Sequence, residues 1–101
     1  MIDCLNRCGI SSKTVEELYK KYEDSVLNNI SCNEEECVKI IEILRRIGIE
    51  SNIIEQLLIS RIDLFFITCN EFVEKVKKVG MTNFVQMINQ DWLNIETIFE
   101  D

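Results

Sequence analysis

Some residue types are missing from this chain, and others are scarce. Its 101 residues include no proline, no histidine and only three glycines. Folds built from many short strands need frequent turns, so this composition argues against an all-β protein and for helices. The lack of histidine removes the commonest general base and the commonest metal ligand. No apolar run is long enough to span a bilayer.

Sequence motifs that carry chemistry are absent too. The chain has no glycine-rich phosphate loop, no nucleophile elbow and no pair of cysteines separated by two residues, a spacing common in zinc sites. A cysteine nucleophile would have no histidine to activate it. We therefore expect a protein that is not an enzyme and that uses no metal, no cofactor and no small-molecule substrate.

The cysteines indicate a reducing compartment. Their number, five, is odd, and the first residues do not form a secretory signal. A disulfide framework is therefore not expected. We expect a cytoplasmic protein, or a matrix-side one if a targeting segment has been removed. Its cysteines should act as small buried hydrophobic residues. These residues are Cys4, Cys8, Cys32, Cys37 and Cys69.

The remaining composition bounds the fold and the partners. Hydrophobic residues make up 47% of the chain, which is enough for one core in a domain of this length. The formal net charge is −7. Nucleic-acid-binding domains are usually basic, so this charge argues against nucleic acid and against an anionic membrane surface as partners.

All the glycines occur in one local pattern, which indicates an internal repeat. In each copy an apolar residue, three variable residues, the glycine and a second apolar residue follow one another. The copies are Leu5–Ile10, Leu44–Ile49 and Val76–Met81 (in the first two, the opening apolar residue is leucine). Gly9, Gly48 and Gly80 are 39 and 32 residues apart, which falls in the range of helical repeats.

Residues that favour helix N-termini recur at matching places. Ser12 and Ser51 each lie three residues after a glycine. We predict that both are N-caps, because a serine oxygen can accept a hydrogen bond from the free N–H groups of the first helical turn. In the third copy, Thr82 or Asn83 is predicted to take the same role.

Two capping boxes give a second match between copies. Ser31 is followed three residues later by Glu34, and Thr68 is followed three residues later by Glu71. In this motif the two side chains satisfy free backbone donors at a helix start. The coincidence of two such motifs at equivalent places favours a true repeat.

Apolar residues at helical spacing predict the remaining elements. Each copy should contain a capped helix, a short helix and a longer helix that ends at glycine. The expected helices cover residues 2–8, 13–22, 24–27, 32–47, 52–60, 63–66 and 69–79, with another from 83 and a partial copy after 92. The sequence therefore predicts one all-α domain over residues 1–101. It would be a short array of about two and a half helical repeats of 32–39 residues, with boundaries near Gly9, Gly48 and Gly80.

This pattern resembles the repeats of the mitochondrial transcription termination factor (mTERF) proteins. Those repeats read roughly as Leu-x-x-x-Gly-Leu or -Ile, then a capped helix, a short helix that often opens with proline, and a serine-led long helix back to glycine. Residues 44–80 are similar to one such repeat, 4–48 to another, and 81 onward to a partial third. Glu23 and Ile62 stand where the family often has proline. The resemblance implies a helical-repeat fold and binding to double-stranded nucleic acid.

Basic residues precede each glycine by two or three positions. Stacked repeats would align them into a basic ladder along one edge, where backbone phosphates could bind. Alternatively, each cation complements the dipole at a helix C-terminus, which stabilises the helix by about 0.3–1 kcal/mol. The candidate nucleic-acid-binding residues of this basic ladder are Arg7, Arg45, Arg46, Lys77 and Lys78.

An apolar cluster lies near the C-terminus, at Trp92, Ile95, Ile98 and Phe99. These residues either close the core or form an exposed patch. An exposed patch would be a candidate interface with a second copy or with another protein.

Two functions remain open at this point. The favoured one is a non-enzymatic helical-repeat module that binds a protein partner or self-associates. The alternative is a small nucleic-acid-binding regulator that resembles the mTERF repeat proteins and contacts phosphates through the basic ladder. Membrane binding is not expected. The alternative requires that the cations share one face and are not neutralised by Glu42 or Glu74.

Overall fold

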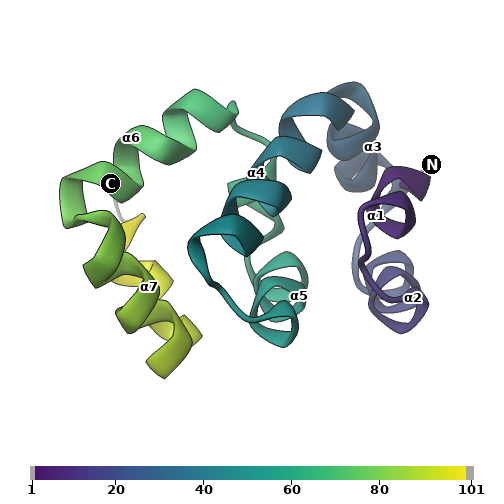
Figure 1. The fold of residues 1–101 in the computed structure, drawn as a ribbon. Coiled ribbons are helices and arrows are strands. Elements are labelled where there is room, and N and C mark those ends of the chain that lie inside the picture. Colours follow the sequence, from purple (N-terminus) through teal and green to yellow (C-terminus); the bar gives the residue numbers. More distant parts are fainter. Residues whose placement is uncertain (1, 100–101) are drawn as a thin grey trace.

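Helices follow one another throughout residues 2–99, which are the residues that the computed structural model describes (Figure 1). This range contains no strand, so the all-α prediction is confirmed. The elements, in which η denotes a 3₁₀ helix, are α1 (Asp3–Arg7), α2 (Ser12–Lys21), α3 (Asp24–Cys32), α4 (Glu34–Ile47), α5 (Ser51–Ser60), η1 (Ile62–Phe65), α6 (Cys69–Val79), α7 (Met81–Gln90), η2 (Trp92–Asn94) and α8 (Ile95–Ile98).

The starts of α2 and α5 differ from the prediction by one residue. The N-cap of α2 is Ser11, whose hydroxyl accepts a hydrogen bond of 3.3 Å from the backbone N–H of Thr14. Ser12 is the first helical residue. In α5 the N-cap is Glu50, and Ser51 is the first helical residue. The predicted caps at Ser12 and Ser51 are therefore wrong, because the extended backbone of the preceding residue already ends each loop.

The third copy turns more tightly than predicted. Gly80 ends α6 and is also the N-cap of α7, with φ of 97° and ψ of 132°. One glycine with positive φ redirects the chain without any loop. Thr82 and Asn83 consequently lie inside α7, and the predicted cap at either residue is wrong.

The predicted N-cap at Thr68 is confirmed. Thr68 is the N-cap of α6 and accepts a hydrogen bond of 3.1 Å from the backbone N–H of Glu71. Ser31, in contrast, lies inside α3, and Asn33 separates α3 from α4. The predicted short helix at 24–27 is only the first part of α3, because buried Leu27 and Ile30 continue its apolar face.

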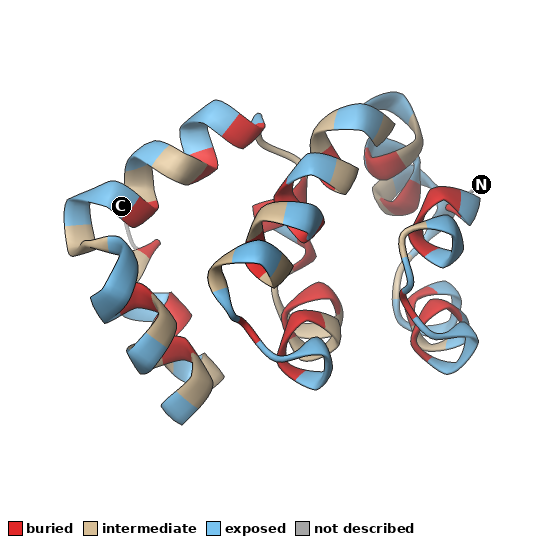
Figure 2. Cartoon of the chain, in the orientation of Figure 1, coloured by how far each residue is buried: buried red, intermediate tan, exposed pale blue. Residues whose placement is uncertain are grey.

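The buried faces of the helices meet in one core (Figure 2). Phe72 packs edge-on against Phe84, with ring centroids 6.3 Å apart, and against Phe99 at 5.1 Å. A buried side chain of this kind contributes about 1.5–3 kcal/mol relative to an exposed one. Cysteine burial matches the prediction for Cys4, Cys37 and Cys69. Cys8 is half-buried, and Cys32 is exposed, so the prediction is wrong there.

The helices form two rows that place the candidate sites (Figure 1). In one row α1 packs against α4 and α4 against α6; in the other α2 packs against α5, and α7 follows. The described part measures 34 × 23 × 23 Å along its principal axes. None of its helices is long and apolar enough to cross a membrane. The predicted C-terminal cap at Gly48 is confirmed, because this residue has left-handed backbone angles.

Candidate binding grooves

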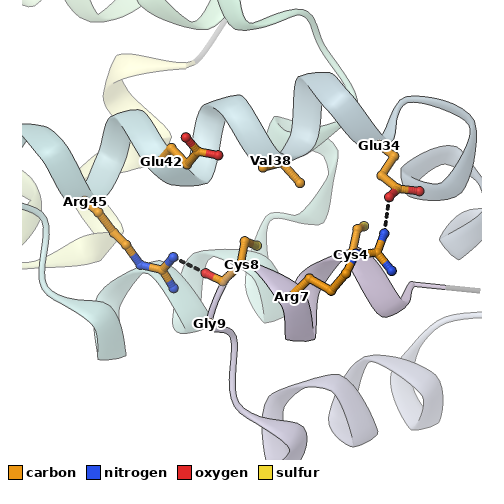
Figure 3. A pocket seen from close by; sticks show the side chains of 8 residues that line it. All are labelled: Cys4, Arg7, Cys8, Gly9, Glu34, Val38, Glu42 and Arg45. Carbon is orange, nitrogen blue, oxygen red and sulfur yellow. Dashed lines mark hydrogen bonds and ion pairs between the residues drawn. The ribbon is translucent and has the colours of Figure 1, made fainter.

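An open groove of about 520 Å³ lies between α1 and the outer face of α4 (Figure 3). It is called the α1–α4 groove below. Two residues of the predicted basic ladder face into it from opposite ends, one from each helix. The full lining consists of Cys4, Arg7, Cys8, Gly9, Glu34, Val38, Glu42 and Arg45.

Both arginines of this groove have partners within the chain. Arg7 forms an ion pair with Glu34 of α4; the Arg7 side chain is largely exposed, and the Glu34 side chain is about half exposed. Arg45 is half-buried, and it donates a hydrogen bond to the carbonyl oxygen of Cys8 at the end of α1. Arg45 also lies against Gly9, where a Cβ atom would be only 3.0 Å from its guanidinium nitrogen. The two arginines therefore hold α1 against α4.

The thiols around the groove are held in their neutral form. Burial raises the pKa of Cys37 to about 12, and it also raises the pKa of Cys4 and Cys8. The nearby carboxylate of Glu34 raises the pKa of Cys4 further. Because the thiolate is the reactive form, these residues are poor nucleophiles. Within residues 2–99, no group of three or more His, Cys, Asp or Glu side chains is placed to hold a metal.

The other three cations of the basic ladder are exposed. Arg46 lies in the last turn of α4, and Lys77 and Lys78 lie in the last turn of α6. None of the three forms an ion pair with another described residue. Glu42 and Glu74, the expected neutralising residues, form no ion pair with the ladder in this part of the chain. The neutralising residue is Glu34, which the sequence did not single out for this role.

A second groove, of about 400 Å³, lies where the end of α4 meets the first turns of α7. This α4–α7 groove is mostly apolar and is lined by Ile47, Met81, Thr82, Val85 and Gln86. Sequence reasoning missed it, because it joins segments that are far apart in the chain. One signal was available in the sequence: Met81 follows the third glycine, whereas isoleucine follows the other two. In the structure Met81 is 39% exposed, whereas Ile10 and Ile49 are buried.

A polar network joins the second row of helices. The carboxylate of Glu55 on α5 accepts hydrogen bonds from Thr14 and, at 2.7 Å, from the hydroxyl of Ser11. Burial alone would raise the pKa of Glu55, but these hydrogen bonds outweigh it and lower that pKa. Asn89 on α7 makes a similar connection. It donates to the carbonyl of Gly48 at 2.8 Å and accepts from the backbone N–H of Glu50 at 3.1 Å.

The C-terminal cluster is largely packed into the core. Ile95 and Phe99 are buried, and Trp92 and Ile98 are half-buried against core residues. Leu93, which was not among the candidate interface residues, is 54% exposed and lies beside them in the chain. The exposed apolar surface at this end is therefore smaller than a patch of all four candidate residues would be, and its most exposed residue is Leu93.

The described part of the chain thus contains two open grooves, and three exposed cations at the ends of α4 and α6. No family model, curated protein or solved structure matches the chain. The similarity to the mTERF repeats stays a prediction from the sequence pattern. The features of the molecule that bear on its function are the grooves and the surroundings of the five cations.

Proposed function

We propose that this chain is a non-enzymatic helical-repeat module that binds a protein partner through the open grooves beside α4. The α1–α4 groove combines apolar side chains with charges of both signs, and the α4–α7 groove is mostly apolar, as parts of protein interfaces are. The buried thiols and the lack of histidine offer no chemistry that would compete with a binding role.

The observation that carries this proposal is the engagement of Arg7 and Arg45 by the chain's own groups. Arg7 pairs with Glu34, and Arg45 is fixed at the end of α1. Three exposed cations of the basic ladder remain. Affinity for a duplex depends on the number of phosphates that the protein contacts, and each contact contributes about −0.9 to the slope of log K against log salt. Three such contacts give only weak binding to a duplex. In a chain of net charge −7, long-range repulsion opposes even these contacts.

The repeat organisation is part of the proposal, and two observations support it. The helices α2, α5 and α7, one from each proposed copy, form one row, while α1, α4 and α6 form the other (Figure 1). A second observation concerns the residue two places after the glycine. In two copies its backbone N–H donates a hydrogen bond to a side chain on another helix. The N–H of Ser11 donates to Glu55 at 3.4 Å, and the N–H of Glu50 donates to Asn89 at 3.1 Å.

One observation favours the alternative, a small nucleic-acid-binding regulator. Arg46, Lys77 and Lys78 are exposed at the ends of α4 and α6 and have no ion-pair partner in residues 2–99. These three residues are the part of the basic ladder that phosphates would contact. The resemblance to the mTERF repeats points in the same direction.

Two measurements on the full chain decide between these functions. Selection from a displayed library of random peptides should yield peptides that bind the chain in solution. Anisotropy of labelled duplex and single-stranded DNA and RNA should show no binding even at low salt, where electrostatic attraction is strongest. Micromolar binding to nucleic acid that weakens steeply with salt, together with a failed peptide selection, would replace the proposal by the alternative. Sedimentation over a range of concentrations would reveal self-association.

A further inference from the structure

We infer that the α4–α7 groove, lined by Ile47, Met81, Thr82, Val85 and Gln86, binds a partner segment that carries apolar residues with acidic residues beside them. This inference rests on the proposed function, because it names the chemistry of the protein partner. Two independent features support it: the apolar lining of the groove, and the exposed cations at the ends of α4 and α6, which are close to the lining residues in the chain.

The lining offers apolar contacts that the core does not use fully. Ile47 and Val85 are half-buried, and Met81 is 39% exposed. The volume of about 400 Å³ falls within the range of ligand pockets. Methionine adapts its shape to different apolar partners and is common at binding surfaces. In the two earlier copies the residue at the position of Met81 is isoleucine and is buried, so this position is ordinarily covered.

The charge beside the groove is positive. Helix α4 ends at Ile47, directly after Arg46. Helix α6 ends at Val79, directly after Lys77 and Lys78, and only Gly80 separates it from Met81. These cations are exposed and have no ion-pair partner among the described residues. A partner with acidic residues next to its apolar ones would supply the missing counter-charges.

A peptide fits this combination better than a nucleic acid does. Backbone phosphates would pair with the three cations but would leave Ile47, Met81 and Val85 without apolar contacts. An amphipathic acidic segment uses both features, because apolar contacts supply affinity and charge complementarity supplies orientation and association rate. The overall charge of −7 limits attraction of an acidic partner to the places where cations are gathered.

The test uses the peptides selected on the full chain. Their sequences should be enriched in Asp and Glu next to Leu, Ile, Phe or Met. On titration into ¹⁵N-labelled protein, the largest amide shift changes should fall at Ile47, Met81 and Val85. The double variant Arg46→Glu/Lys78→Glu should weaken binding about tenfold or more, which corresponds to about 1.4 kcal/mol.

A matched control changes the net charge equally at another place. The double variant Lys13→Glu/Lys20→Glu alters two exposed lysines of α2 and should leave the affinity within about twofold. Met81→Gln, at an exposed position, tests the apolar contribution and should weaken binding without a change in the far-ultraviolet circular dichroism.

Other outcomes overturn the inference in distinguishable ways. Selected peptides that are not acidic, or that shift resonances elsewhere, would refute it while the proposed function stands. Equal losses in the two double variants would show that only the overall charge matters. Failure to select any peptide, combined with duplex DNA that shifts the signals of Arg46, Lys77 and Lys78, would refute the inference and the proposed function together.

Discussion

At the scale of single residues, the five cysteines have very different surroundings. Cys32 is exposed, whereas Cys4, Cys37 and Cys69 are buried and burial raises the pKa of each. A buried thiol of raised pKa has almost no thiolate near neutral pH, and thiolate is the species that attacks a disulfide reagent. Poor accessibility and a raised pKa therefore both slow the reaction of the buried thiols.

We predict one fast-reacting thiol and at least three slow ones in the folded chain. With an aromatic disulfide reagent at pH 8, Cys32 should react first, and the three buried thiols should react only as the protein opens. Absorbance of the released thiolate measures both phases. The variant Cys32→Ser should lose the fast phase, and unfolding in denaturant should make all phases fast. A fast phase that survives in Cys32→Ser and accounts for more than the half-buried Cys8 would contradict the assignment.

A second residue-scale prediction concerns Glu55 and pH. Its pKa is lower in the folded chain than the ordinary value of 4.5, because hydrogen bonds from Thr14 and Ser11 outweigh the effect of burial. The stabilisation is therefore fully present above pH 4.5 and is lost as pH falls through the lowered pKa. We expect Glu55→Gln to cost about 1–2 kcal/mol at pH 7 and distinctly less at pH 3.

Urea unfolding of both proteins at the two pH values measures this difference. Thr14→Val should reduce the same pH dependence, because it deletes one of the donors to the Glu55 carboxylate. An identical cost of Glu55→Gln at pH 7 and pH 3 would show that hydrogen bonding to the ionised form contributes nothing.

At the scale of elements, the start of α2 offers a sharp comparison. Ser11 accepts the hydrogen bond from Thr14 and is the N-cap, whereas its neighbour Ser12 is exposed in the first helical position. We predict that Ser11→Ala lowers the free energy of unfolding by about 1 kcal/mol. Ser12→Ala should change it by less than about 0.5 kcal/mol. Thermal or urea unfolding checks both, and a larger loss for Ser12→Ala would restore the cap that the sequence pattern favours.

The sequence predicted the helices better than their ends. Apolar periodicity predicts the bounds of α4, α5 and α6 to within two residues, because the buried face of a helix is formed by many residues together. The position of each helix end, in contrast, depends on the backbone conformation of one or two residues. Ser31 has the spacing of a cap, yet buried Leu27 and Ile30 extend α3 past it. Gly80 turns the chain directly into α7, which no spacing rule indicates.

At the scale of the whole molecule, a few polar contacts connect the helices in addition to the shared apolar core. Asn89 bridges α7 to the backbone that links α4 and α5, through Gly48 and Glu50. In an array of stacked units each unit contacts mainly its neighbours, so loss of one bridge should loosen one end only. We predict that Asn89→Ala speeds amide hydrogen exchange in α7 and leaves α2 nearly unchanged.

Exchange followed by mass spectrometry gives this comparison peptide by peptide. Asn83→Ala is a matched control on the same helix, because the Asn83 side chain bonds only locally, to the carbonyl of Val79, among the described contacts. It should affect the first turn of α7 alone. Equal acceleration of exchange in α2 and α7 by Asn89→Ala would mean that the molecule opens as one unit and would argue against the repeat proposal.

The candidate binding surfaces could be predicted only in part. The position of cations before each glycine is visible in the sequence, and Arg46, Lys77 and Lys78 are exposed as a ladder requires. That Arg7 pairs with Glu34 and that Arg45 lies on Gly9 depends on how α1 docks against α4. The α4–α7 groove likewise depends on long-range packing. Local rules carry no information about such contacts between distant segments.

The contact between Gly9 and Arg45 also restricts the order in which substitutions can accumulate. Any side chain at Gly9 is strained by its φ of 90° and in addition meets the guanidinium of Arg45 at 3.0 Å. At Gly48 the atom nearest to an added Cβ is Cγ1 of Val85, at an ordinary van der Waals distance of 3.7 Å. A lineage that first replaces Arg45 with a short residue removes one of the two obstacles at Gly9. A side chain at Gly9 therefore has two costs, backbone strain and a shift of the Arg45 guanidinium, whereas at Gly48 backbone strain is the main cost.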